Sequence, residues 1–189
     1  MLIRLSVPAA LAVPLADVKL ALRIDFDDDD DRLESLISAE TQRYEDFTGR
    51  IMAPVDLEYR FDRWGDPLCI PVAPVREVTE VVYLDSANVE QTVPASDWYS
   101  LTTDEGVEVW FNDTFSIPTL TTRGQAVRVR FRAGYDQPNA SGSGDDPELA
   151  SNAVDRINII RMVQCIYDLD ELMPDIEMIR TMGNRRIFR

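Results

Sequence analysis

Carboxylates are the side chains of this sequence best suited to chemistry, and they are concentrated in one place. Five of them are consecutive: Asp27, Asp28, Asp29, Asp30 and Asp31. Such a run suggests calcium, but a calcium-binding loop alternates its ligands, carries a central glycine and closes with a glutamate. This run lacks that order, since Glu34 follows too closely and no glycine intervenes. We therefore expect a solvated helix start, in which the acids meet unpaired backbone N–H groups, and no metal site.

Other catalytic side chains are scarce. The chain contains no histidine, so the commonest general base and metal ligand is missing. Cys69 and Cys165 are far apart in sequence, and we expect two free thiols. Acids such as Glu105 and Glu108 lie close together but carry no motif of a glycosidase or nuclease. Pairing of carboxylates in space is invisible in a sequence. Our prediction is a protein that is not an enzyme and binds no cofactor.

Charge and hydropathy exclude two further classes. The 189 residues include 34 acids and 19 bases, which gives a net charge of −15. A nucleic-acid clamp needs a dense basic face to displace counterions, so this balance argues against one. No apolar run approaches the roughly 20 residues that a membrane helix needs, and we expect no membrane partner. A hydrophobic content of 45% is ample for a packed core.

Two helices are expected to flank the aspartate run. Leu15, Val18 and Leu22 recur at helical steps before it, and the apolar residues after it do the same up to Phe47. Gly49 follows the last of these, where a left-handed cap is expected. Residues 1–13, interrupted by prolines, are expected to form an extended arm that packs either on a neighbouring molecule or on its own domain.

Residues 51–135 change to the two-residue alternation of strands. The stretch 55–62 alternates apolar and polar side chains, and residues 77–84 form a β-branched run. Residues 85–88 are typical of a hairpin turn. Six or seven strands are expected here, forming an antiparallel β-sheet or small barrel inserted between helices.

The remaining chain is expected to hold a linker, a helix and a tail. Residues 136–146 are rich in glycine and serine and predict a flexible linker. Asp146 and Pro147 are typical of a helix start, and two apolar stripes predict that the helix over 147–173 is buried on two sides. Residues 174–189 differ, because the last ten residues hold four of the 19 bases.

That basic, apolar ending suggests a docking tail, in which arginines bind carboxylates and apolar groups fill a pocket. We expect its arginines to be exposed and dispensable for the fold. The residues predicted to dock are Ile179, Arg180, Met182, Arg185, Arg186, Ile187, Phe188 and Arg189.

The order of these motifs resembles a known family. The matching segments are residues 18–25 (VKLALRID), the aspartate run, residues 33–40 (LESLISAE), residues 47–50 (FTGR) and residues 127–135 (VRVRFRAGY). Together they resemble the head–tail connector (adaptor) proteins of tailed bacteriophages, including those of prophages and gene-transfer particles.

The resemblance implies a structural protein of the virion. Connectors of this family bind the portal protein beneath the head as a ring, generally of twelve neighbouring copies. The ring extends the channel through which double-stranded DNA passes, and it is the platform for a stopper or tail-terminator protein. The family implies assembly in the bacterial cytoplasm, a final location at the head–tail interface, and a C-terminal segment that reaches the portal. The five aspartates could then belong to the ring or its lumen.

The expected fold is α+β, with a helical bundle interrupted by the β domain. Residues 1–50 hold the arm and the first two helices, and residues 147–173 add the third helix of the bundle. Two other functions stay open. An acidic inhibitor or DNA mimic that binds a basic partner would need carboxylates in phosphate-like rows. A carboxylate-based hydrolase would need acids that converge in a pocket.

Overall fold

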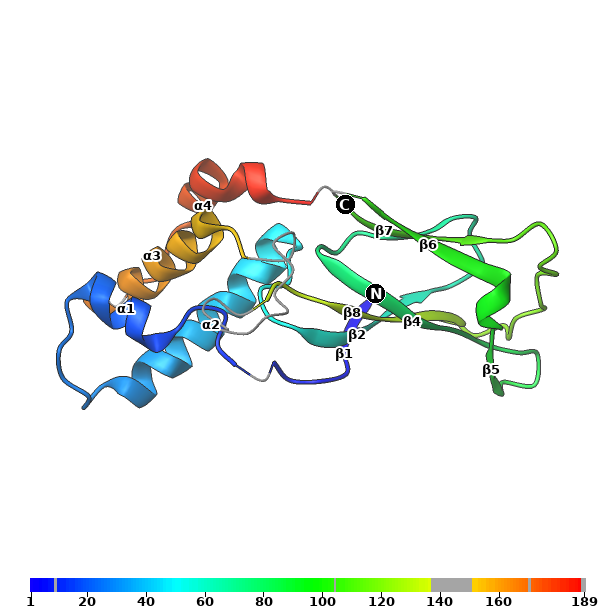
Figure 1. The fold of residues 1–189 in the computed structure, drawn as a ribbon, viewed down its shortest axis with the longest axis horizontal. Coiled ribbons are helices and arrows are strands. Elements are labelled where there is room, and N and C mark those ends of the chain that lie inside the picture. Colours follow the sequence, from blue (N-terminus) through cyan, green and yellow to red (C-terminus); the bar gives the residue numbers. More distant parts are fainter. Residues whose placement is uncertain (9, 104, 137–150, 170, 188–189) are drawn as a thin grey trace. The chain divides into compact units, whose positions relative to one another are not determined.

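The chain forms two compact units in this computed structural model, which describes all residues except 9, 104, 137–150, 170 and 188–189. The sheet unit comprises Met1–Val7 and Pro54–Gly134, and the helical unit comprises Pro8–Ala53 and Tyr135–Ile187. Figure 1 labels their elements. Within the described residues the helices are α1 (Leu15–Leu22), α2 (Asp30–Thr48), α3 (Ala153–Leu169) and α4 (Asp175–Met182). The strands are β1 (Leu2–Arg4), β2 (Val55–Phe61), β3 (Leu68–Ile70), β4 (Val75–Leu84), β5 (Glu90–Thr92), β6 (Trp98–Thr103), β7 (Gly106–Phe111) and β8 (Val127–Ala133).

The strands of the sheet unit form two antiparallel sheets. The larger sheet has the order β1-β2-β8-β4-β5, and the smaller has the order β3-β7-β6. The strands expected from the sequence are present, and residues 85–88 form the predicted turn, in which Asn88 N donates to the Asp85 carbonyl. A closed barrel is absent from the described strands, so the expectation of a small barrel is wrong. Each sheet ends in edge strands that pair on one side only.

Period-two patterning explains how the larger sheet is oriented. In β8 the residues Val127, Val129 and Phe131 are buried, whereas the arginines between them are on the other face. The same alternation places Glu58 of β2 directly opposite Arg130 of β8. One face of the sheet is therefore core and the opposite face is a charged surface.

The N-terminal arm adds a strand to its own sheet. Residues of β1 pair antiparallel with β2, with Ile3 opposite Glu58. Leu5 N then donates to the Asp56 carbonyl at 2.8 Å. Of the two packing alternatives expected for the arm, the structure shows the one within the chain.

In the helical unit, α1 and α2 are the two helices expected around the aspartate run. Gly49 ends α2 in the left-handed conformation with φ 76°, as predicted, and its N–H donates to the Glu45 carbonyl at 2.8 Å. Arg23 ends α1 in the same conformation with φ 59°, which no glycine signals in the sequence.

Among the described residues, the third helix begins later than the sequence pattern suggested. The predicted linker beyond residue 136 and the predicted helix start at residues 146–148 lie outside the described part of the chain. In the structure α3 begins at Ala153, because the Asn152 side-chain oxygen accepts the Val154 N–H at 2.9 Å. The helix ends at Leu169, before Pro174, as expected.

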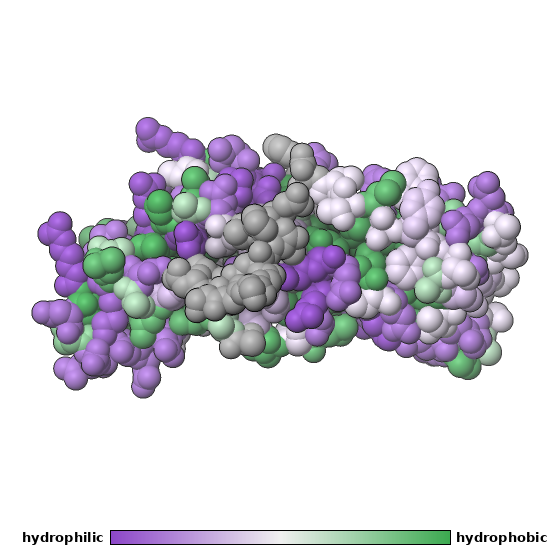
Figure 2. Space-filling model, in the orientation of Figure 1, coloured by the Kyte–Doolittle hydropathy of each residue, from purple (hydrophilic) through white to green (hydrophobic). Residues whose placement is uncertain are grey.

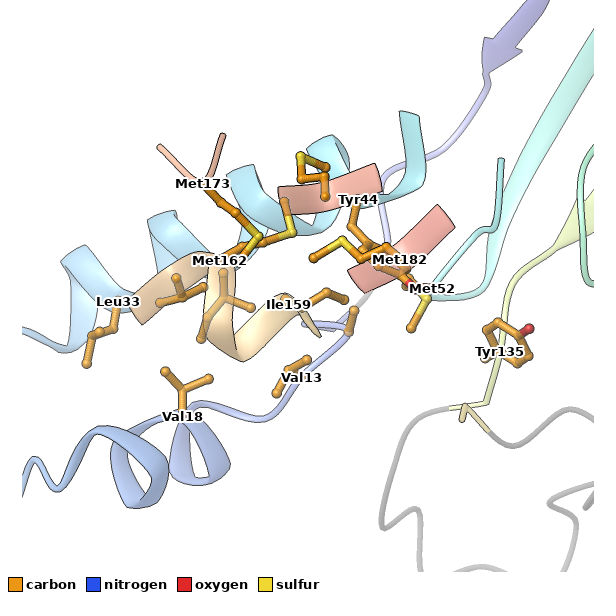
Figure 3. Packing of buried hydrophobic residues seen from close by; sticks show 14 residues of the cluster. Val13, Val18, Leu33, Tyr44, Met52, Tyr135, Ile159, Met162, Met173 and Met182 are labelled. Atoms are coloured by element: carbon orange, nitrogen blue, oxygen red, sulfur yellow. The ribbon is translucent and has the colours of Figure 1, made fainter. Parts of the chain in front are cut away.

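Methionine and aliphatic side chains fill the core of the helical unit. Val18 of α1 and Leu33 of α2 lie near one end of this core, and Tyr44, Met162 and Met182 lie further along it (Figure 3). All five are fully buried, with at most 1% of their surface exposed. The core thus joins α1, α2, α3 and α4, so α4 is part of the fold rather than an appendage.

Gly106 at the start of β7 offers a test of the sheet unit. Its φ is +143°, and a Cβ built there would lie 2.0 Å from the Ile70 carbonyl oxygen. Gly106→Ala should therefore lower the free energy of unfolding by about 2 kcal/mol or more. Gly183→Ala is the matched control, because a Cβ there meets no atom within 4 Å and the backbone is helical. Urea denaturation of both variants checks this, and equal stabilities would contradict it.

Candidate functional site: the C-terminal segment and the acidic turn

The predicted docking residues divide into buried and exposed groups. Met182 is fully buried and Ile187 is 6% exposed, so both contribute to the core. Ile179 is 57% exposed, and Arg180 is also exposed on α4. Phe188 and Arg189 lie outside the described residues. Only part of the predicted set therefore lies on a surface that a partner could reach.

Arg185 is held by a buried carboxylate. Its Nε and one terminal nitrogen donate to the two oxygens of Asp155, each at 2.6 Å. The Asp155 side chain is 0% exposed, and Tyr44 Oη donates to one of the same oxygens at 2.6 Å. Burial, and then the nearby Asp155 carboxylate, raise the pKa of Tyr44, so its hydroxyl stays a donor. The expectation that the tail arginines are free of the fold is wrong for Arg185.

Backbone contacts fix the rest of the segment to the end of α2. Ile187 N donates to the Thr48 carbonyl at 2.7 Å, and Arg50 Nε donates to the Arg185 carbonyl at 2.9 Å. The Arg186 guanidinium lies 4.9 Å from the ring centre of Phe47, a cation–π distance. The segment 183–187 is therefore fixed to the end of α2 by backbone hydrogen bonds and by one side-chain contact.

The aspartate run is partly neutralised by other helices. Lys19 of α1 donates to Asp27 at 2.6 Å and to Asp30 at 2.7 Å. Its ammonium group lowers the pKa of Asp27, and the same hydrogen bonds raise the pKa of Lys19. Tyr167 of α3 donates to Asp29 at 2.7 Å. The run leads into α2 as predicted, but the Asp29 side chain makes no capping hydrogen bond to the backbone N–H groups of the helix. Asp27, Asp28 and Asp31 are exposed.

No cluster prepared for a metal ion is found in the described part of the chain. No group of three or more Cys, Asp or Glu side chains there is arranged to hold a metal ion. Glu105 and Glu108 line a shallow hollow beside β3, and Glu108 accepts a hydrogen bond from Trp110 Nε1 at 3.1 Å. Both cysteines are free thiols. None of the described helices is both long and apolar enough to span a bilayer.

The charged face of the larger sheet is a second polar cluster. Arg130 of β8 donates to Glu58 at 3.0 Å, to Glu80 at 2.8 Å and to Glu90 at 2.9 Å. Arg60 donates to the other oxygen of Glu58 at 2.6 Å. Burial raises the pKa of Glu58, but the bonds from the two arginines outweigh it and lower that pKa below its ordinary value. The network joins β2, β4, β5 and β8, and its arginines and glutamates form ion pairs with one another.

Sequence patterns missed the residues that anchor these clusters. Asp155 is the single acid over residues 153–164, and that isolation was the available signal. Lys19 is the single lysine of the chain and precedes the aspartates by eight positions. The partners of Asp155, Arg185 and Tyr44, lie 30 and 111 residues away in sequence. The partners of Lys19, Asp27 and Asp30, lie 8 and 11 residues away.

Comparison with known proteins bears directly on these elements. Residues 13–90 match the family model of the phage gp6-like head-tail connector proteins. The matched range contains α1, the aspartate run, α2 and the first strands after them. The resemblance to head–tail connectors predicted from the sequence is thus confirmed. No curated protein matches the chain in sequence.

Solved structures share the fold over the whole chain. A chain in the virion of a native gene transfer agent particle is similar with a TM-score of 0.77 and 21% identity. Chains in the neck of an empty particle, computed with C6 symmetry, and of a native particle, computed with C12 symmetry, each give 0.76, with 21% and 20% identity. In each case the similarity covers 100% of this chain and 96% of the other.

The Arg185–Asp155 pair predicts an asymmetry between neighbouring arginines. Arg185→Ala leaves the Asp155 carboxylate buried without its cation, so we expect a loss of about 3–5 kcal/mol in the free energy of unfolding. Arg186→Ala removes only an exposed cation–π contact and should cost about 1 kcal/mol or less. Denaturant unfolding monitored by circular dichroism compares the two. A small effect of Arg185→Ala would mean that the pair does not stabilise the helical unit.

The lowered pKa of Glu58 predicts a pH-dependent contribution to stability. A depressed carboxyl pKa stabilises the fold above the ordinary value of 4.5, and this stabilisation is lost as the pH falls through the folded-state pKa. Glu58→Gln should therefore be less stable than the wild type by about 1–3 kcal/mol at pH 7, with the difference shrinking in acid.

Urea denaturation at a series of pH values measures this difference. The control is Glu77→Gln, which alters an exposed glutamate on β4 and should change stability little at any pH. A difference for Glu58→Gln that stays constant with pH would show that lost packing, not lost charge, is responsible.

Proposed function

We propose that this chain is a subunit of a head–tail connector, a structural part of a phage or gene-transfer particle. The observation that carries the proposal is the coincidence of two likenesses. The connector family model matches the N-terminal helices, and neck chains share the fold over the full length. In this role the protein has no catalytic centre, and its task is to hold other proteins in place. Assembly occurs in the bacterial cytoplasm, and the final location is the head–tail interface of the virion.

A ring of twelve copies is the proposed assembled form. The similar neck chains come from structures computed with C12 and C6 symmetry. A twelve-fold ring also obeys six-fold symmetry, so one ring size accommodates both. Such a ring would contact the portal protein on one side and a stopper or tail-terminator protein on the other.

Charge suits passage of double-stranded DNA through the ring. A net charge of −15 opposes tight binding of phosphates and favours sliding without a grip. Asp27, Asp28 and Asp31 are the exposed members of the aspartate run, and Asp28 and Asp31, which Lys19 does not engage, are the candidates for a position in the ring or its lumen. Asp27, Asp29 and Asp30 are already engaged by Lys19 and Tyr167.

These engaged carboxylates also weaken the rival function. An acidic inhibitor or DNA mimic would present carboxylates to a basic partner, and most of this run is bonded within its own helical unit. The connector function is therefore the one that we propose.

The exposed part of α4 is the proposed portal-docking surface. Ile179 and its neighbour Ile176 are 57% and 78% exposed, and Arg180 lies beside them in sequence. Large exposed apolar side chains next to an arginine are typical of interface anchors. Met182, Arg185 and Ile187 hold the segment to the helices and so position this surface.

Cosedimentation with the portal protein encoded beside this chain tests both steps. The wild type should bind near one copy per portal subunit, and Ile179→Asp combined with Arg180→Glu should abolish binding. Ile117→Asp, which alters an exposed residue of the sheet unit, is the matched control and should bind normally. Truncation before α4 is unsuitable, because it removes the buried Met178 and Met182.

The outcomes separate the function from the docking site. A wild type that does not bind the portal would overturn the connector proposal. Normal binding by the double variant would retain the connector and place the docking site elsewhere on the chain.

A further inference from the structure

The outer face of α3 combines apolar groups with positive charge. Val154 and Ile157 are each 48% exposed, and Arg161 is exposed one to two turns further along. Arg161 has no ion-pair partner among the described residues. Over residues 153–164 the single acid is Asp155, which is fully buried. We name Val154, Ile157 and Arg161, which recur at steps of three and four on one side of the helix, the basic-apolar face.

A hollow of opposite charge lies on α2. It lies along the outer side of that helix, flanked by the segment that precedes α1, and it contains two carboxylates and two small hydroxyl side chains. Its lining residues, named here the acidic hollow, are Leu11, Asp31, Glu34, Ser35 and Ser38. The surface over the α1–α2 turn is largely hydrophilic in Figure 2, whereas hydrophobic patches interrupt it over α3 and α4.

The two surfaces are separate. Helices α2 and α3 pack together, and Ile37 of α2 and Ile159 of α3 are buried. Glu34 and Ile157 are exposed and so lie outside this contact. Each surface is therefore available to a neighbouring copy.

The residues of the two surfaces also recur at the same steps along their helices. The basic-apolar face presents Val154, Ile157 and Arg161 at steps of three and four, and the acidic hollow presents Asp31, Glu34 and Ser38 at the same steps. Two helices pack by fitting such ridges into grooves, and small residues such as serine allow close approach. The aliphatic side chains Val154 and Ile157 would enter the hollow between Ser35 and Ser38, with Arg161 beside the carboxylates.

We propose that the basic-apolar face of one copy binds the acidic hollow of the next copy in the ring. This inference rests on the proposed function, which supplies the ring. A closed ring needs a heterologous contact between two different surfaces, and a self-complementary patch would give only dimers. Two separate surfaces of opposite charge, one on α3 and one on α2, meet that requirement. An acidic partner protein could bind the basic-apolar face alone, but it would leave the acidic hollow without a role.

Cysteine cross-linking of the chain to itself tests the contact. Cys69 and Cys165 are first replaced by serine, and Ile157→Cys and Ser35→Cys are introduced together in one chain. Oxidation of a concentrated solution should give a ladder of oligomers on a non-reducing gel. Each single-cysteine variant alone should stay monomeric, and a mixture of the two should give dimers only.

Charge reversal in this double-cysteine background decides whether the pairing is specific. Arg161→Glu should abolish the ladder, and adding Glu34→Arg should restore it. Arg180→Glu makes the same charge change on α4, outside the proposed contact, and should leave the ladder intact. Circular dichroism confirms that each variant is folded, as expected for exposed positions.

Each outcome bears on the contact independently of the portal experiment. A missing ladder, dimers from either single variant, or failure of Glu34→Arg to rescue Arg161→Glu would overturn the proposed interface. Portal binding by the wild type could still succeed in that case, and the connector function would stand with a different ring contact. A chain that gives the ladder but never binds the portal would instead overturn the connector function.

Discussion

The bidentate pair between Asp155 and Arg185 closes the helical unit. A carboxylate with no exposed surface is costly to bury, and its cost is met only where cation and hydrogen-bond donors both reach it. Here Arg185 supplies the cation from beyond α4, and Tyr44 supplies a further donor from α2. Without the segment beyond α4 the buried Asp155 carboxylate would lose Arg185, and without α2 it would lose Tyr44. The pair therefore makes the C-terminal segment obligatory for the fold.

This constraint changes how a basic C-terminal segment is interpreted. Arginines and apolar residues at the end of an acidic chain are typical of a peptide that docks on another protein, and the same composition also serves an internal anchor. In this chain Met182 and Arg185 are internal anchors that contact the helices, whereas Ile179 and Arg180 on the same segment are exposed. A rigid anchor next to an exposed patch holds that patch in a fixed place, which suits a connector that must meet its partner in a defined orientation.

In both the helical unit and the larger sheet, many carboxylates are bonded to donors of the same chain. The aspartate run is acidic in sequence, yet Lys19 and Tyr167 engage three of its five members. On the larger sheet, Arg130 joins Glu58, Glu80 and Glu90 into one network. What is left for partners is a surface rich in acids with scattered exposed arginines, among them Arg161 of α3 and Arg180 of α4. In a ring built from one chain, such sparse positive positions would decide which surfaces of neighbouring copies meet.

Local patterns in the sequence determined the secondary structure and the family resemblance. Helical spacing around the aspartates, Gly49 at the end of α2 and the alternation in β8 all depend on neighbours a few residues away, so they can be recognised in one dimension. The tertiary structure decided which polar residues are buried, that the sheets stay open and where the tail lies. Those outcomes depend on contacts between residues far apart in the chain, such as Tyr44 and Asp155, which are separated by 111 positions. No periodicity encodes such a contact, because the partner is brought near only by the packing of whole helices around a common core.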